Sequence, residues 1–501
     1  MKWLISLHRF CNKHEWIIFL VILVLVLRLP SFTMPHYYGD EEIYFVMGRA
    51  WANDVPMYKA VFDHKPPLIY IMAGIAPTML AFRGLLAAVM VVHTVLFWKL
   101  AQLFWAKTRP NLAYLSSFIF VLLTTLPTFE GLTVNAELLM MMPVTAAAVI
   151  LWPSFANASA GKNAHWKKFL IAGLLGGIGW LFKIPVAFDM VAIGLYFFVF
   201  QKKTLMEGVR AIFSWSFLAY ALAFVTPLAL TFVYYYLKGT GPDYLATVLT
   251  VNLGYVSSWS TSTYTFNPFK SGLVVRGTVL AVYTLLLYIS RKKLDKSFVF
   301  ATLWFGFSLF GALLSARPYP HYLQEVVAPA ALFVPFIFAA EHLLTWVFIA
   351  IVIAISGLVE YQIKFWGYPT ISVYKTYWQY VTGQISWNSY MSRFDNASRN
   401  YEIASYLNER LTENDQIFNW GTDSTIYNLT NRLPSGGKYI VSFHIKDLKK
   451  YDYVMEQLAI NKPNYILMHE GAGDFPELQS LLDHKYALAK TIDNVEIYIR
   501  L

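Results

Sequence analysis

Long apolar runs, separated by short polar segments, fill the first 360 residues of the chain. A helix needs about 20 mostly apolar residues to cross the ~30 Å hydrocarbon core of a bilayer. Runs of this kind predict eleven membrane-spanning helices, at residues 16–34, 84–105, 111–128, 137–153, 169–182, 184–200, 211–237, 273–290, 297–314, 326–340 and 343–360. Two of these runs are short and meet at Lys183, which predicts a hairpin. The pattern therefore predicts a polytopic α-helical membrane protein.

The pattern changes after residue 360. Residues 361–394 are rich in Tyr and Trp, which favour the boundary between membrane and water, so we expect an interfacial linker there. Helix-like and strand-like segments then alternate, with helices expected at 397–411 and 446–460 and strands at 415–421, 464–469 and 494–500. Such alternation predicts a mixed sheet covered by helices. We therefore expect three parts: a transmembrane domain at 1–360, a linker at 361–394 and a small α/β domain at 395–501.

The composition agrees with a membrane protein and excludes several other classes. Only 14% of the residues are charged, against about 25% in a typical soluble protein. The net charge is +10, but the basic residues form short clusters between apolar runs, so we predict no nucleic-acid partner. Cys11 is the single cysteine, which excludes an internal disulfide. No small-residue cleavage site follows the first apolar run, which predicts a retained helix rather than a signal peptide.

The distribution of Lys and Arg predicts the orientation in the membrane. Short segments such as 291–296 (RKKLDK) are strongly basic, and the positive-inside rule places them, together with the N-terminus, in the cytoplasm. An odd number of spans then places the C-terminal domain on the outer side of the cell (cytoplasmic) membrane. The same assignment brings residues 40–65, 135–137, 238–272 and 317–325 to the outer face.

Carboxylates are concentrated just after the first span, where Asp40, Glu41 and Glu42 are adjacent. Neighbouring residues of a helix point about 100° apart, so the three cannot share one face. One of them can point into a cavity while the others face water. The alternative is that Asp40 or Gly39 caps a helix whose first turn favours acids.

A second polar motif, Asp63-His64-Lys65, stands directly before Pro66-Pro67. The prolines restrict the backbone of the residues around them and would hold this motif rigidly. Asp and His are ligand types for a divalent cation, and Lys suits a phosphate oxygen. The alternative is a simple turn with a Lys that extends toward water.

These motifs and four others occur in the order known from one superfamily. They are GDEE-x-Y at 39–44, HKPPLIY at 64–70, TVNAE at 133–137, WLFKIP at 180–185, RPYPHYLQ at 317–324 and WGTDSTIYNLTNRLPSGGKY at 420–439. The chain resembles the GT-C glycosyltransferases of the protein-mannosyltransferase type, whose superfamily includes the lipid A aminoarabinose transferase. In that branch a Glu precedes KPP where this chain has His64, so a metal ligand set here would differ.

The resemblance implies a GT-C fold and an inverting transfer of a hexosyl or pentosyl group from a polyprenyl-phosphate carrier to an acceptor hydroxyl at the outer face. It assigns the general base to Asp40. Basic side chains should gather at the departing phosphate, and the candidates are Lys65, Lys183 and Arg317. Candidates for contacts with the sugar or acceptor are Glu41, Asn135, Glu137, Tyr322 and Gln324. Candidates for binding a Mg, Mn, Ca or Zn ion are Asp63, His64 and His321.

The expected partners are a polyprenyl-phosphate-linked sugar, membrane lipids, and a glycan, lipid or protein acceptor. We expect a groove between spans to hold the polyprenyl tail. Three residue assignments keep alternatives. Lys183 could pair with Asp189 or extend to the interface, His321 could be a buried, hydrogen-bonded histidine, and the aromatic loop 238–272 could be an interfacial belt instead of a lid or acceptor site.

Two other functions are weighed against the transferase. A lipid-linked glycan transporter or flippase should show internal repeats and charges in the middle of its spans. A polymer ligase acting on pyrophosphate-linked glycans should carry a denser Arg cluster in an outer loop. The chain shows no internal repeat, and its outer basic residues are single. The sequence therefore favours the glycosyltransferase.

Overall fold

The computed structural model describes residues 2–105, 109–153, 165–255 and 272–501. It divides into two compact units, which are described separately. The helical unit comprises Met1–Leu29, Leu85–Thr231 and Asn252–Thr370. The α/β unit comprises Pro30–Gly84, Phe232–Val251 and Ile371–Leu501.

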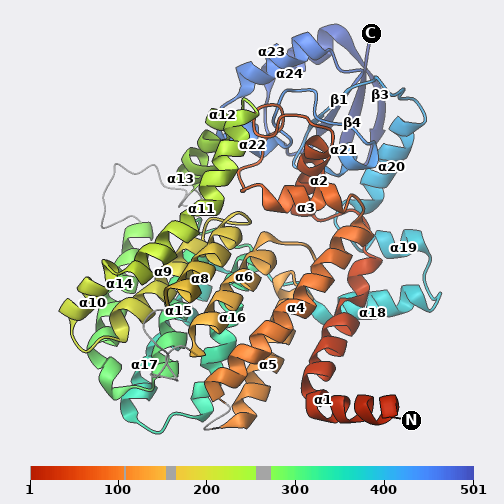
Figure 1. Ribbon diagram of the computed structural model, residues 1–501. Helices are drawn as coiled ribbons and strands as arrows, with labels where there is room; N and C mark the ends of the chain where they lie inside the picture. The colour runs from red at the N-terminus through yellow and green to blue at the C-terminus, as the bar shows by residue number, and fades with distance from the viewer. Residues whose placement is uncertain (1, 106–108, 154–164, 256–271) are drawn as a thin grey trace. The chain divides into compact units, whose positions relative to one another are not determined.

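The helical unit contains the apolar helices of the chain (Figure 1). Its elements, two of which continue into the α/β unit (α4 and α11), are α1 (Lys2–Arg28), α4 (Met79–Trp105), α5 (Pro110–Thr125), η2 (Pro127–Phe129), α6 (Ala136–Leu151), α8 (His165–Trp180), α9 (Val186–Leu195), η4 (Tyr196–Phe200), α10 (Leu205–Ile212), α11 (Trp215–Leu237), α13 (Asn252–Tyr255), α14 (Gly272–Ser290), η6 (Arg291–Lys293), α15 (Lys296–Ala312), η7 (Pro320–Leu323), α16 (Gln324–Phe333), η8 (Val334–Phe338) and α17 (Leu343–Ile363).

Every apolar run identified in the sequence is helical in the structure. Within the described residues, six helices are long and apolar enough to cross a membrane: His14–Phe32, Met79–Trp105, Trp215–Leu237, Gly272–Lys293, Pro320–Phe338 and Leu343–Ile363. Four shorter apolar helices accompany them: Pro110–Thr125, Ala136–Leu151, Val186–Phe200 and Lys296–Ala312. The chain is a multi-pass helical membrane protein, as predicted, while the number of crossings and their orientation stay predictions.

Some buried polar side chains of the helical unit form hydrogen bonds between helices, as is common among apolar helices. Asp189 on α9 is fully buried and accepts a hydrogen bond from Trp304 Nε1 at 2.7 Å and another from the Ser308 hydroxyl, both on α15. Helix α15 also packs against α16, and α6 packs against α8. The contact between α9 and α15 joins helices more than 100 residues apart, whereas the other two pairs are close along the chain.

The α/β unit contains the remaining elements (Figure 1). They are η1 (Leu29–Phe32), α2 (Gly39–Ala52), α3 (Leu68–Ile75), α12 (Gly241–Leu245), η5 (Ala246–Val251), α18 (Thr370–Val381), α19 (Trp387–Met391), α20 (Ala397–Asn408), β1 (Ile417–Trp420), α21 (Thr425–Leu429), α22 (Ser442–Asp447), α23 (Tyr451–Asn461), β2 (Tyr465–His469), α24 (Pro476–Lys485), β3 (Tyr486–Ile492) and β4 (Val495–Arg500).

The sheet has the order β1-β2-β4-β3. β1 and β2 are parallel, with Ile417 opposite Tyr465, and the other pairs are antiparallel. The three predicted strands and the mixed sheet are confirmed, whereas β3 was not predicted. β3 is an edge strand with a bulge between Leu488 and Lys490, and its middle residues are mostly exposed, so its apolar alternation is weak.

The polar segment after the first span folds with the C-terminal residues in this unit. The backbone N–H of Phe62 donates to the carbonyl of Lys438 at 2.8 Å, and the Phe62 ring packs in a core with Trp420, Tyr439 and Leu458. Nothing in the local sequence indicates this pairing, because the partners are more than 350 residues apart. The segment that carries Asp63 to Lys65 is therefore held by the C-terminal fold.

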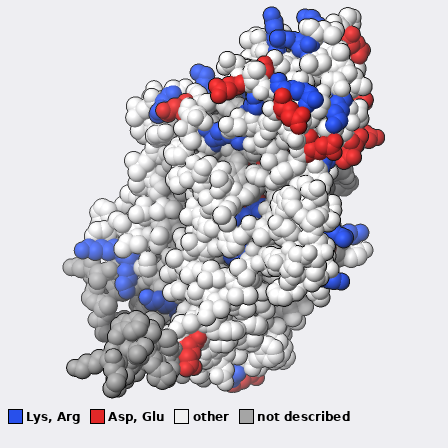
Figure 2. All heavy atoms as spheres, turned by 90° about the vertical axis from the view of Figure 1, so that its right-hand side faces the viewer, with Lys and Arg blue, Asp and Glu red and all other residues white. Residues whose placement is uncertain are grey.

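Charged side chains are unevenly distributed on the surface shown in Figure 2. Lys, Arg, Asp and Glu crowd over the upper part of that view, which contains the sheet, while a wide area elsewhere carries few charges. Few charged side chains are expected on the surface of helices that face a bilayer.

Candidate functional site

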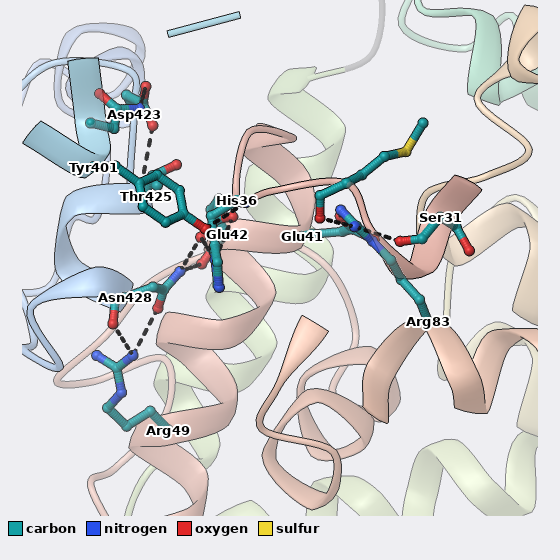
Figure 3. Close-up of polar contacts among 12 residues, drawn as sticks. Ser31, His36, Glu41, Glu42, Arg49, Arg83, Tyr401, Asp423, Thr425 and Asn428 are labelled. Carbon is teal, nitrogen blue, oxygen red and sulfur yellow. Dashed lines mark hydrogen bonds and ion pairs between the residues drawn. The ribbon is translucent and has the colours of Figure 1, made fainter. Parts of the chain in front are cut away.

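The three adjacent carboxylates of α2 have different surroundings, and the first to be distinguished is Glu41. Its carboxylate oxygens accept from Arg83 Nη2 at 2.6 Å and Nε at 3.1 Å, and both side chains are buried (Figure 3). Arg83 Nη1 also donates to the carbonyls of Ser31 and Met34. Glu41 thus anchors α2 to the segment before it.

Glu42 is held on the other side of α2 by the C-terminal segment. Its carboxylate lies 3.0 Å from His36 Nδ1 and accepts from Asn428 Nδ2 at 2.7 Å (Figure 3). Asn428 Oδ1 in turn accepts from Arg49 Nη2 at 3.0 Å. Glu42 is fully buried, so this network fixes the rotation of α2.

Asp40 is the carboxylate of the three that stays partly open, with 28% of its side chain exposed. It accepts a hydrogen bond from the Tyr44 hydroxyl at 3.0 Å, and one of its oxygens lies 3.5 Å from Lys65 Nζ. Tyr38 occupies the N-cap position of α2, and no side chain caps the helix. The capping role considered for Asp40 and Gly39 is therefore wrong.

The Asp63–Pro67 segment is rigid because hydrogen bonds hold both its backbone and its side chains. The Tyr70 hydroxyl donates to Asp63 Oδ2 at 2.7 Å and accepts from the backbone N–H of Lys65 at 3.0 Å. The Tyr58 hydroxyl donates to the Lys65 carbonyl at 3.1 Å. Lys65 is 8% exposed and pairs with Asp40 and Asp63, so it does not extend to water.

Two glycines allow α2 and α3 to approach closely. A Cβ on Gly48 would lie 2.5 Å from the backbone nitrogen of Gly74, and one on Gly74 would lie 2.7 Å from the Gly48 carbonyl oxygen. Real Cβ atoms do not approach so closely. This contact sets the spacing between Asp40 at the start of α2 and Lys65 just before α3.

His444 joins Asp63 and His64, although sequence reasoning missed it. Asp63 Oδ1 lies 3.1 Å from His64 Nδ1 and 3.5 Å from His444 Nε2, and ligand atoms of all three residues lie within 4.8 Å of one another. We call Asp40, Asp63, His64, Lys65 and His444 the loop cluster. No signal around His444 marks it, because its role depends on a contact with a segment 380 residues earlier.

The side chains of the loop cluster fit a divalent cation. Asp63 Oδ1 and both ring nitrogens of His444 are buried and, among the described residues, make no well-formed hydrogen bond. Burial favours the neutral acid, but Lys65 and His64 hold the pKa of Asp63 well below its usual range. Burial lowers the pKa of His444 to about 3. An ionised Asp and a neutral His are the forms that bind metal.

A second polar group, which we call the helix-end cluster, lies in the helical unit and consists of Glu130, Glu137, Lys183, His321 and Tyr322. Lys183 forms an ion pair with Glu137, and its Nζ lies 4.1 Å from the centroid of the Tyr322 ring. His321 Nδ1 is hydrogen-bonded to Glu130, and its Nε2 lies 4.0 Å from Glu137.

The helix-end cluster shows the contacts of two predicted residues, Lys183 and His321. Lys183 lies in the turn between α8 and α9, as the hairpin predicted, but its partner is Glu137 and not Asp189, which binds Trp304 and Ser308 instead. His321 is a buried, hydrogen-bonded histidine in the helical unit, whereas Asp63 and His64 belong to the α/β unit.

The other predicted residues of the helical unit lie at helix ends. Asn135 is fully buried, and its amide donates to the Glu130 carbonyl at 3.3 Å. Gln324 donates to the carbonyls of Leu123 and Phe129 at 3.0 and 2.9 Å. Arg317 lies between α15 and η7. Both amides therefore hold the turn that carries Glu130.

Glu130 was not predicted, and part of the aromatic loop lies outside the described residues. Glu130 has a left-handed backbone, with φ 57°, and is followed by Gly131, so an acid in a Gly-containing turn before TVNAE was the available signal. Of the loop 238–272, residues 256–271 lie outside the described residues. The lid and belt interpretations of that segment both stay predictions.

By sequence, no family model and no curated protein matches the chain. The structure is similar to that of ArnT from Cupriavidus metallidurans bound to undecaprenyl phosphate, with a TM-score of 0.58, 12% identity, and coverage of 97% of this chain and 98% of the other. The structure of the same ArnT in the apo state gives a TM-score of 0.55 and 11% identity, and the match covers 98% of each chain. An oligosaccharyltransferase of Archaeoglobus fulgidus in complex with Zn and sulfate matches with a TM-score of 0.43 and 14% identity, over 90% of this chain and 67% of the other. This likeness is too weak to support an inference.

At such low identity, the similarity to ArnT establishes the fold. The chain has the fold of ArnT, which agrees with the GT-C type of fold expected from the sequence. The predicted fold class is confirmed over nearly the whole chain.

Proposed function

We propose that the protein is an inverting membrane glycosyltransferase that moves a sugar from a polyprenyl-phosphate carrier to an acceptor hydroxyl at the outer face of the cytoplasmic membrane. The observation that carries the proposal is the surroundings of Asp40. It is the partly exposed carboxylate of the α2 run, and it lies beside a Lys that two tyrosines and the following prolines hold in place.

Asp40 is the general base of the proposed reaction. A base must come within hydrogen-bond reach of the proton that it removes, which requires an accessible carboxylate. Glu41 and Glu42 are fully buried. Glu41 is bound to Arg83, and Glu42 to His36 and Asn428, so neither is as accessible to an acceptor hydroxyl as Asp40. The acceptor oxygen attacks the anomeric carbon as its proton passes to Asp40, and the bond from that carbon to the phosphate oxygen breaks.

Lys65, Lys183 and Arg317 are the cations proposed for the departing phosphate. Lys183 supports this role because it is a cation near the end of a membrane helix, and such a charge needs an anionic partner. Glu137 is that partner in the structure. When a lipid phosphate binds, we expect Lys183 to exchange part of its interaction with Glu137 for the phosphate.

The polyprenyl tail is proposed to lie in an apolar groove between α14, α15 and α17, with a volume of about 240 Å³. Leu309 and Leu313 line this groove and also pack in a hydrophobic cluster with Tyr322. Because the Tyr322 ring contacts Lys183, the groove would place the tail next to a phosphate held by Lys183.

Asp63, His64 and His444 are proposed to bind a divalent cation, which would supply positive charge for phosphate oxygens when bound. A ligand set of two His and one carboxylate favours Zn or Mn, because Ca and Mg prefer sites made of oxygen ligands. Glu41, Asn135, Glu137, Tyr322 and Gln324 stay candidates for contacts with the sugar or acceptor.

The test is turnover of purified protein with a panel of polyprenyl-phosphate sugars and cell extract as acceptor, followed as release of free polyprenyl phosphate. Asp40→Asn should lower turnover about 10²–10⁴-fold, the usual contribution of a general base. The control is Asp54→Asn, since Asp54 is an exposed carboxylate paired with Lys238 and should not affect turnover. Unchanged turnover in Asp40→Asn would move the base to Glu41 or Asp63. Absence of turnover with every donor would favour a transporter.

A further inference from the structure

A second apolar groove lies in the helical unit, between α9, α10 and α11, with a volume of about 390 Å³. It follows α9 and the π-helical turn η4 from Ala187 to Val199, which corresponds to about 18 Å at 1.5 Å per residue. That length is close to half of a ~30 Å hydrocarbon core, the depth of one leaflet. Gly194 lies along the groove, and its missing side chain widens it.

The rim of this groove is strongly basic. Lys202, Lys203 and Arg210 follow Val199 along the chain or lie on α10. Arg291 brings a second basic segment to the same place, because its guanidinium donates to the carbonyls of Phe200 at 3.2 Å, Lys202 at 3.2 Å and Lys203 at 3.4 Å. Lys292, Lys293 and Lys296 stand on that segment, and all three are exposed.

The carboxylates of these two segments are bound to backbone groups and do not form the partners of the rim lysines. Glu207 accepts from the backbone N–H of Lys203 at 3.1 Å. Asp295 caps α15 and accepts from the N–H groups of Ser297 and Phe298. Seven Lys and Arg therefore stand against two carboxylates in residues 201–210 and 291–296, and the rim keeps a strong positive charge.

Helix α10 marks the depth of the rim in a membrane. Large apolar side chains at its surface and just after it are strongly exposed, namely Met206 at 61%, Phe213 at 84% and Trp215 at 80%. A short helix with exposed apolar residues, a neighbouring Trp and basic residues is typical of the boundary between lipid tails and head groups. The basic rim thus lies at head-group level, and the groove extends from it into the tail region.

We propose that this groove and its rim bind an anionic phospholipid, with the phosphodiester on the basic rim and one acyl chain in the groove. Basic pockets between membrane helices suit lipid phosphates, while a purely apolar groove would accept any tail. The predicted orientation places this lipid in the cytoplasmic leaflet. The site does not depend on the proposed glycosyltransferase activity, and its residues differ from the loop and helix-end clusters.

The first experiment measures lipid retention by the purified full-length protein in detergent, using native mass spectrometry. Phosphatidylglycerol and phosphatidylcholine with the same acyl chains are titrated in parallel, and we expect tighter retention of phosphatidylglycerol. Each lost positive charge near a lipid surface should weaken binding about fivefold. The variant Lys202→Gln, Lys203→Gln, Lys292→Gln, Lys293→Gln should therefore lose the preference for phosphatidylglycerol. The control Lys99→Gln, Arg109→Gln removes two exposed or partly exposed basic residues on α4 and just before α5, away from the residues that line the groove.

A second variant tests the groove itself. A Cβ on Gly194 would make an ordinary contact, 3.4 Å from Tyr220 Cε1, so Gly194→Leu should fold and fill the groove. It should weaken retention of phosphatidylglycerol, whereas Gly357→Leu, at a helical glycine with open space around it, should not. If the fourfold variant does not fold, the pair Lys292→Gln, Lys293→Gln replaces it.

Four results would overturn the proposal. One is equal retention of the two lipids by the unchanged protein. Another is an equal loss in the Lys99, Arg109 control, which would mean that basic residues act only as a general surface charge. The third is unchanged retention in Gly194→Leu. Glycerol phosphate and inorganic phosphate are added as competitors, and displacement by either at concentrations near those of the lipid would show a phosphate site rather than a lipid site.

Discussion

The loop cluster and the helix-end cluster are built from the same residue types, yet they are held in different ways. In the loop cluster, Tyr58 and Tyr70 hold the backbone of Lys65, and the potential ligand atoms of Asp63 and His444 are left without well-formed hydrogen bonds among the described residues. In the helix-end cluster, Lys183 has Glu137 and His321 has Glu130 as direct partners.

The difference has a physical reason. The loop cluster lies on a polar segment that a soluble-type core supports, so tyrosines and prolines can position its charges without neutralising all of them. The helix-end cluster lies at the ends of apolar helices, where an unpaired charge is costly. We infer that the loop cluster is ready to bind, while the helix-end cluster must exchange partners when its ligand arrives. The predictions that follow test this contrast.

The largest effect is expected for the buried ion pair between Arg83 and Glu41, which anchors α2, the helix that carries Asp40 of the loop cluster. Arg83→Leu leaves the buried carboxylate of Glu41 without its main partner, which should lower the free energy of unfolding by about 3–5 kcal/mol. Thermal unfolding in detergent measures the change. The double variant Arg83→Leu, Glu41→Gln should recover part of the loss, and a double variant no more stable than Arg83→Leu would contradict this account.

Metal binding should separate the two clusters. His444→Ala should weaken binding of Zn or Mn by at least roughly 10–100-fold, the usual cost of losing a partner of a ligand, because it removes one of three direct ligands. His321→Ala, in the helix-end cluster, should leave it unchanged. Competition with a chelating dye on dialysed protein gives both affinities, and an equal effect of the two variants would remove the distinction between the clusters.

Binding of the polyprenyl-phosphate sugar donor should depend on Lys183. Lys183→Gln removes a charged hydrogen-bond donor, so we expect the KM for the polyprenyl-phosphate sugar to rise about tenfold with a smaller change in kcat. Steady-state kinetics on the active donor measures both constants. Lys238→Gln is the control, since Lys238 forms an exposed pair with Asp54. A change in kcat alone would indicate that Lys183 does not bind the ground-state donor.

The smallest effect is expected from Glu137→Gln. If Glu137 holds Lys183 until the donor binds, its neutralisation should weaken that hold and lower the donor KM about two- to fivefold, near the lower end of the net contribution of one hydrogen bond. The same kinetic assay measures this change. A raised KM would mean that Glu137 contacts the substrate directly, as the resemblance allowed.

The candidate site could be predicted only in part. The run Asp40–Glu42 and the motif before Pro66-Pro67 were visible because polar residues beside a long apolar run are unusual. The role of each carboxylate was not visible, because it depends on Arg83 and Asn428, which lie about 40 and 390 residues away.

The sequence by itself determined the membrane class, the helical runs and three of the four strands of the C-terminal sheet, because hydropathy and periodicity act over short stretches of chain. Only the tertiary structure decided that the loop before Pro66 folds with the C-terminal residues, that His444 joins Asp63, and that Lys183 pairs with Glu137 rather than Asp189. Each of these is a contact between segments distant in sequence. A side chain finds such a partner only when packing brings the two segments together, and no local pattern encodes it.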